Sequence, residues 1–169
     1  MPEFGGFTPD NYETQFNEEG VDVILEPAPI NEAQPGANFN HPPSVLKNYL
    51  KMGLIDANKY EDKYGLRCYE DKVGLLANQT KRQMCYGMRD QKLQEYILIN
   101  LMVEPYDNWV KSPMMTIRYV TKQYGGMDMY WTAHAKYFSH WQEIDHQIWQ
   151  HIADWNVTNQ KMVTQIKSQ

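Results

Sequence analysis

The chain has 169 residues, of which 42% are hydrophobic and 13% aromatic, and its formal net charge at pH 7 is −5. This length suits one ordinary domain with extensions, and the high aromatic share argues against disorder throughout. No apolar run approaches the roughly 18 to 20 residues of a membrane-spanning helix, and no basic stripe indicates a nucleic-acid partner.

Residues 1–43 are predicted to form an acidic, mostly irregular arm. Residues 1–46 contain eight acidic residues and no Lys or Arg, whereas the rest of the chain carries all 16 basic residues. Prolines recur from Pro2 to Pro43 and exclude long helices, so only Val21 to Leu25 is a plausible short strand. Such an arm is either solvated or lies along a basic surface of a partner.

Residues 44–124 are predicted to form a helical body. Ser44 follows two prolines and suits a helix N-cap, and the apolar residues after it continue to Gly53. Between Val73 and Val103 there is no proline, and apolar residues recur near helical spacing, which predicts two helices or one bent helix. A further helical or extended piece runs from Met114 to Tyr124 and ends at the Gly125-Gly126 break.

Residues 125–169 are predicted to form a long amphipathic helix from Tyr130 to about Met162. At 1.5 Å per residue it is roughly 45 to 50 Å long, which exceeds the radius of a small domain. We therefore expect its apolar stripe to contact other polypeptides, although folding back wholly on its own chain is the alternative. The residues of this predicted partner interface are Tyr130, Tyr137, Trp141, Ile144, Ile148, Ile152 and Trp155.

Together these elements predict an all-α protein, a small helical domain with an irregular acidic arm and a long C-terminal helix. Residues that indicate chemistry are few. Cys68 and Cys85 are too few for a disulfide scaffold or a four-thiolate metal site, and we expect both to be reduced packing residues. A nucleophilic cysteine–histidine pair stays open, because such partners meet only in the fold.

The C-terminal histidines are spaced six, six and five residues apart, whereas metal-binding helices use three or four. Glu143 to His146 matches the Glu-x-x-His unit of di-iron bundles, but the chain has no second such unit. We therefore predict no metal site, no cofactor and no catalytic residue.

From Lys63 to Leu66 the sequence begins to resemble subunit 7, the ubiquinone-binding protein, of ubiquinol:cytochrome c reductase, which is respiratory complex III. That family shows a Lys-x-Gly-Leu turn, acidic residues, a helix with arginines, and then Pro-x-x-x-Trp. The resemblance covers about residues 50–115, and the family's Arg-Leu-Pro is missing, with Thr80 to Arg82 nearest to it. The matching positions are Gly65, Leu66, Glu70, Asp71, Arg89, Pro105 and Trp109.

The resemblance implies a small helical subunit on the matrix side of the mitochondrial inner membrane, peripheral to the membrane and packed on cytochrome b and the core subunits. Its expected function is that of a non-catalytic accessory subunit, which supports assembly and stability of complex III in electron transport from ubiquinol to cytochrome c. One alternative is an accessory subunit of another organellar membrane complex, such as complex I or the ATP synthase. Another is a helical metal or redox enzyme.

Overall fold

The strands and helices of the chain are seen in a computed structural model that describes residues 20–27, 41–72, 82–102 and 113–167, with side chains of the last helix described to residue 155. Most of the predicted acidic arm therefore lies outside the described residues. The strands are β1 (Asp22–Pro27), β2 (Tyr60–Lys63), β3 (Leu66–Asp71), β4 (Arg82–Asp90), β5 (Glu95–Met102), β6 (Met114–Thr121) and β7 (Met127–His134). The α-helices are α1 (Pro42–Lys51) and α3 (Trp141–Lys167), and the 3-10 helices are η2 (Gln123–Gly125) and η3 (Ala135–His140).

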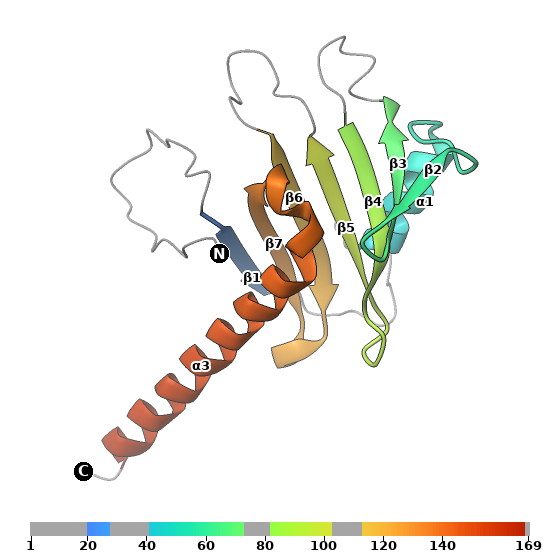
Figure 1. Cartoon of the computed structure of the whole chain (residues 1–169). Coiled ribbons are helices and arrows are strands. Elements are labelled where there is room, and N and C mark those ends of the chain that lie inside the picture. The colour runs from blue at the N-terminus through green and yellow to red at the C-terminus, as the bar shows by residue number, and fades with distance from the viewer. Residues whose placement is uncertain (1–19, 28–40, 73–81, 103–112, 168–169) are drawn as a thin grey trace, which may run out of the picture. The chain divides into compact units, whose positions relative to one another are not determined.

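The seven strands form one antiparallel sheet in the order β1-β7-β6-β5-β4-β3-β2 (Figure 1). Strands β2 to β7 follow one another as a meander, and β1 joins the free edge of β7. The predicted all-α fold is therefore wrong, and so is the helical body over residues 44–124. The short strand expected near Val21 to Leu25 is confirmed as β1.

The burial pattern of β6 is typical of a strand, whereas that of β5 explains why its residues were predicted to be helical. In β6, Met115, Ile117 and Tyr119 are buried and alternate with less buried residues, as a half-covered strand requires. In β5, by contrast, Ile97, Leu98 and Ile99 are buried in succession, because both faces of the sheet are covered at this position. A continuous apolar run has no period of two, so it resembles one face of a helix.

Tight turns place glycines where the backbone needs a positive φ. Tyr64 and Gly65 join β2 to β3 as a two-residue turn, with φ angles of 51° and 79°. Positive φ at both central residues is the requirement of the type I′ turn, which suits the twist of a β-hairpin. The Gly125-Gly126 pair, with φ angles of 89° and 106°, turns the chain between β6 and β7.

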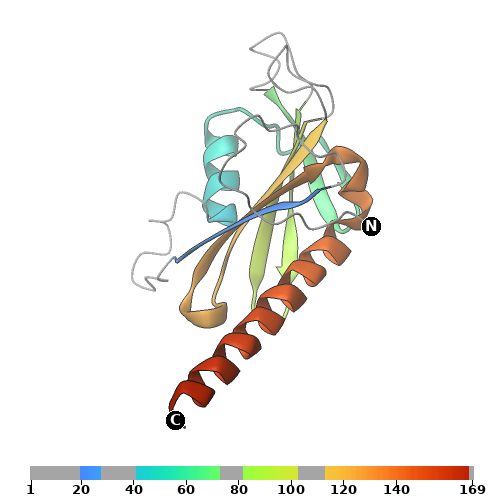
Figure 2. The same cartoon turned by 90° about the vertical axis from the view of Figure 1, so that its left-hand side faces the viewer.

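Helix α1 packs on the face of the sheet around β5 and β6 (Figure 2). The helix predicted after the double proline is confirmed, but its N-cap is His41 rather than Ser44, because Pro42 and Pro43 occupy the first turn. Proline is favoured there, since the first N–H groups of a helix have no partner within it. Val45, Leu46 and Tyr49 pack against a buried cluster that consists of Ile55, Tyr69, Met84 and Leu98.

The chain divides into two compact units, Met1–Lys136 and Tyr137–Gln169. In the second unit, helix α3 begins at Trp141, so the predicted helical start at Tyr130 is wrong and Tyr130 to His134 belong to β7. The error arose because, at 100° per residue, Tyr130 falls on the same helical face as the apolar residues of the true helix. Residues 130–134 are nevertheless the end of strand β7. Among the described residues no helix is long and apolar enough to cross a membrane.

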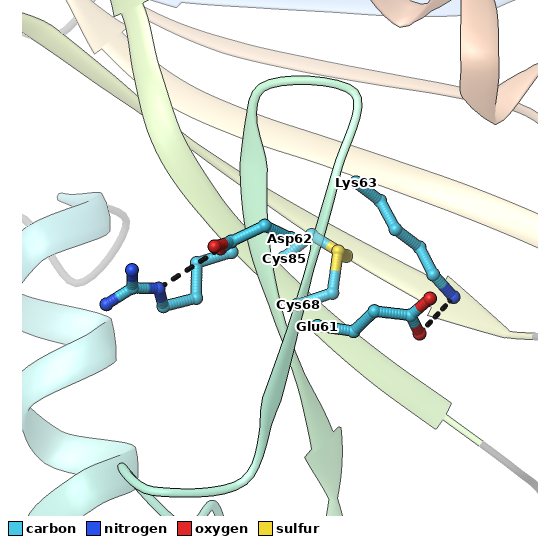
Figure 3. The surroundings of a disulfide bond; sticks show 6 residues. Glu61, Asp62, Lys63, Cys68 and Cys85 are labelled. Atoms are coloured by element: carbon cyan, nitrogen blue, oxygen red, sulfur yellow. Dashed lines mark hydrogen bonds and ion pairs between the residues drawn. A yellow bond between two sulfur atoms is a disulfide. The ribbon is translucent and has the colours of Figure 1, made fainter.

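Cys68 and Cys85 form a disulfide between β3 and β4, so the expectation that both are reduced is wrong. The two residues lie directly opposite each other in the strand register, with their Cα atoms 3.9 Å apart. Figure 3 shows the disulfide beside the β2–β3 hairpin, where Glu61 and Lys63 lie on one side and Asp62 points to the side of α1. The crosslink fixes the pairing of β3 with β4, which sequence spacing alone does not reveal.

Candidate functional site

The register of the sheet brings polar side chains together on the face that α1 covers. Side chains alternate between the two faces of a strand, so directly paired residues on neighbouring strands form rows that share one face. Three such rows run beneath α1 and carry two arginines. The rows are Asp71–Arg82–Met102–Met114, Met84–Asn100–Thr116 and Leu98–Arg118–Tyr130.

A partly open pocket of about 310 Å³ lies over these rows; we call it the α1 pocket. Helix α1 contributes Tyr49 to its lining, and five strands contribute the rest. The volume is at the lower end of the range for ligand pockets, which suits a ligand smaller than a drug molecule. Its polar lining residues are Tyr49, Asp71, Arg82, Gln83, Asn100, Thr116, Arg118 and Tyr130.

The charges of the α1 pocket are two guanidinium groups and one carboxylate. Asp71 is buried, with 5% of its surface exposed, and lies directly across the strand pair from Arg82. The Nε atom of Arg82 is buried and has no hydrogen-bond partner within the part of the chain that the structure describes. A buried donor without an acceptor costs about 1–3 kcal/mol, and the terminal N–H groups of the same guanidinium can donate to a ligand in the pocket.

The hydroxyl of Tyr49 is a hydrogen-bond donor at neutral pH. Burial raises the pKa of Tyr49, the negative charge of Asp71 raises it further, and the positive charges of Arg82 and Arg118 oppose this change. The electrostatic influence of both arginines therefore reaches the same phenol. With Asn100 and Thr116, the pocket presents several neutral donors between two cationic ones.

The two arginines of this arrangement match the chemistry of oxyanions. Arginine presents five N–H donors in a planar fork that matches carboxylate and phosphate groups. The two cysteines of the chain are bonded to each other, which removes the cysteine nucleophile that the sequence left open. The guanidinium, hydroxyl and amide groups that remain in the α1 pocket are hydrogen-bond donors that suit an anionic ligand.

A second hollow of about 490 Å³ beside the β2–β3 turn is a weaker candidate. Its charged residues, Asp62 and Arg67, form an ion pair with each other at 3.2 Å, and Arg67 also stacks over the ring of Tyr60 at 3.9 Å. Since these charges already have partners, little remains to select a polar ligand. Leu66, Tyr86 and Gly87 complete a mostly apolar lining.

The predicted interface residues are split between the two units. Tyr130 lies in β7 and lines the α1 pocket, while Tyr137 lies in η3. Along α3 the stripe changes from buried to exposed, because Trp141, Ile144 and Ile148 are each at most 3% exposed whereas Trp155 is 67% exposed. Ile152 is intermediate between them.

The family-like motif positions do not form one site. Gly65 and Leu66 lie at the turn into β3, and Glu70 and Asp71 lie at its end, but of these only Asp71 lines the α1 pocket. Arg89 instead forms a buried ion pair with Glu95 at 2.7 Å. Pro105 and Trp109 lie outside the described residues.

Sequence reasoning missed Tyr49, Arg82, Asn100, Thr116 and Arg118. The one local signal was the alternation of β6, which places Thr116 and Arg118 on the same face of a strand. The other residues come together only through long-range strand pairing. For the C-terminal histidines, the described residues contain no group of three potential metal ligands, and His140 pairs with Glu143 at 3.1 Å.

Comparison of the chain with protein-family models, with curated proteins and with solved structures finds no match. The resemblance to complex III subunit 7 therefore rests on the motif residues alone. The helical fold that this resemblance implies differs from the observed seven-stranded sheet.

Proposed function

We propose that this protein is a non-catalytic binding module for a small ligand that carries an oxyanion, either a carboxylate or a phosphate, and that the α1 pocket is its binding site. The observation that carries the proposal is that two arginines, Arg82 and Arg118, line one pocket together with Tyr49. Hydrogen bonds from a guanidinium to an anion are charge-assisted and contribute roughly 1.5–3 kcal/mol each.

Direct titration tests this function. The intact protein is titrated with acetate, propionate, succinate and inorganic phosphate in a calorimeter at low ionic strength. At least one anion should bind saturably, and Arg118→Gln should weaken that binding at least tenfold. Arg67→Gln is the matched control, because Arg67 is also an arginine on the α1 side of the sheet but does not line the α1 pocket. Absence of saturable binding by every anion contradicts the proposal.

A second proposed role is that of a subunit in a larger assembly, and it does not exclude the first. Its supporting observation is Trp155, which continues the buried stripe of α3 and is 67% exposed. Large exposed aromatic side chains are enriched at protein–protein contacts. Native purification followed by mass measurement tests this role, since a protein that remains a lone monomer in its own cell extract contradicts it.

The disulfide bears on the compartment of either role. Disulfides persist in oxidising compartments and are rare where thiols are kept reduced. Cys68 and Cys85 are bonded, which favours an oxidising location over the matrix side of the mitochondrial inner membrane. We therefore propose an oxidising compartment, and we base the assembly role on helix α3 rather than on the complex III resemblance.

A further inference from the structure

The two arginines of the α1 pocket stand on different strands and far apart along them. Arg82 is at the start of β4 and Arg118 is in the middle of β6, with β5 between these strands. Arg82 shares a row with Met114, and Arg118 lies four residues beyond Met114. With strands about 4.8 Å apart and about 3.4 Å per residue, their Cα atoms are separated by roughly 16 Å.

The neighbours of the two arginines lie in opposite directions across the sheet. The guanidinium of Arg118 lies over the ring of Tyr130, 4.7 Å from its centroid, and Tyr130 is on β7, which is farther from β4 than β6 is. Arg82 is paired in register with Asp71 on β3, in the opposite direction across the sheet. The register therefore places the two arginines at opposite ends of the pocket lining, with the row of Asn100 and Thr116 between them.

Uncharged donors and acceptors occupy the middle of the pocket. Asn100 and Thr116 face each other across β5 and β6, in the row between those of the two arginines. Tyr49 lines the pocket from α1, and the charges of both arginines lower the pKa of its hydroxyl, against the effects of burial and Asp71. A ligand that satisfies all of these groups is polar at its centre and negative at each end.

We propose that the ligand of the α1 pocket is a two-ended anion, a small dicarboxylate or phosphorylated carboxylate, with one anionic group on Arg82 and the other on Arg118. This inference rests on the proposed function. The middle of the ligand lies along Asn100 and Thr116, whose side chains accept and donate hydrogen bonds.

The carboxylate of Asp71 interacts differently with a dianion and with an amino acid, so it distinguishes these two classes of ligand. A zwitterion places its ammonium group on a carboxylate, whereas a dianion is repelled by that carboxylate. An arginine has five N–H donors, more than one carboxylate accepts, so Arg82 can bind an anion although Asp71 lies opposite it in the register. Asp71→Asn should therefore tighten binding of a dianion and weaken binding of a zwitterion.

The test is a calorimetric titration of the intact, disulfide-bonded protein with straight-chain dicarboxylates from malonate to adipate, with 3-phosphoglycerate, and with monocarboxylates of matched length. One of the two-ended anions should bind at least tenfold more tightly than its matched monocarboxylate. Arg82→Gln and Arg118→Gln should each lower the affinity for the dianion at least tenfold, to the level of the monocarboxylate. Arg67→Gln should leave both affinities unchanged, and Arg82→Lys serves if Arg82→Gln does not fold.

Each contrary outcome has a distinct meaning. Equal affinity for monoanions and dianions, with one arginine variant abolishing both, overturns the two-ended ligand but leaves oxyanion binding intact. The same titration with γ-aminobutyrate, which carries one carboxylate and one ammonium group, completes the test: tighter binding than that of glutarate, lost in Asp71→Asn, also overturns the two-ended anion in favour of a zwitterion. No binding of any carboxylate or phosphate overturns the proposed function itself.

Discussion

Replacement of Glu95 by alanine should destabilise the sheet strongly, because it removes the partner of a buried arginine. Arg89 and Glu95 form an ion pair at 2.7 Å, and their side chains are only 7% and 4% exposed. The other carboxylate oxygen of Glu95 accepts hydrogen bonds from Thr121 Oγ1 at 2.8 Å and from the backbone N–H of Lys122 at 2.9 Å. The guanidinium of Arg89 also lies 4.3 Å from the centroid of the Tyr119 ring.

The magnitude follows from what the alanine leaves behind. Removing one partner of a buried ion pair costs about 3–5 kcal/mol, because the other charge stays buried without compensation. The donors of Thr121 and Lys122 lose their acceptor at the same time, which places Glu95→Ala in the upper part of that range. For a domain of this size, about 4 kcal/mol corresponds to a fall in Tm of roughly 8–16 °C.

The assay is urea unfolding at pH 7, followed by far-ultraviolet circular dichroism. Asp62→Ala is the matched control, since Asp62 also pairs with an arginine but at an exposed position, where loss of the pair costs at most about 1 kcal/mol. The double variant Arg89→Met, Glu95→Gln should recover at least half of the loss, because glutamine keeps an acceptor for Thr121. A free energy of unfolding of Glu95→Ala within 1 kcal/mol of the unchanged protein would refute the reasoning.

Three further predictions concern the fold around β3 and β4. The disulfide between Cys68 and Cys85 closes a loop with a sequence separation of 17, so its reduction should lower the free energy of unfolding by about 3 kcal/mol. Urea titrations with and without reductant measure this difference. Free thiols in the unreduced, denatured protein would contradict the crosslink. Gly87→Ala should cost about 1–3 kcal/mol in the same assay, because its Cβ would lie 2.6 Å from Leu66 Cδ2, and a neutral effect would contradict that close approach. Burial and the nearby Tyr96 raise the pKa of Tyr86 to about 12, so ultraviolet titration should show a late-ionising phenol that Tyr86→Phe removes. The pKa of Tyr86 in the folded protein is raised above the unfolded value of 10.0, so its contribution to stability is complete below pH 10 and declines from there to about pH 12. Tyr86→Phe should abolish this pH dependence.

Local patterns in the sequence predicted some elements correctly. The double proline before Ser44 and the apolar residues to Gly53 located α1, since helix starts depend on neighbouring residues. The Gly125-Gly126 pair located the turn after β6 for the same reason. The amphipathic stripe likewise located helix α3, although its predicted start at Tyr130 was wrong because the helix begins at Trp141.

The sheet and the α1 pocket were beyond such reasoning because they depend on long-range pairing. Ile97, Leu98 and Ile99 bury both faces of β5, which removes the period of two that identifies a strand. Arg82 and Arg118 are 36 positions apart in the sequence and share a pocket only because β4, β5 and β6 pair in one register. A single sequence carries no direct record of that register.

The most direct test of the account is an amide and side-chain chemical-shift titration of the isotopically labelled protein with the tightest-binding dicarboxylate. Saturable shifts concentrated at Tyr49, Asn100, Thr116 and the guanidinium groups of Arg82 and Arg118 are the predicted result. Saturable shifts elsewhere on the molecule, with these five residues unchanged, would show that the α1 pocket is not the ligand site.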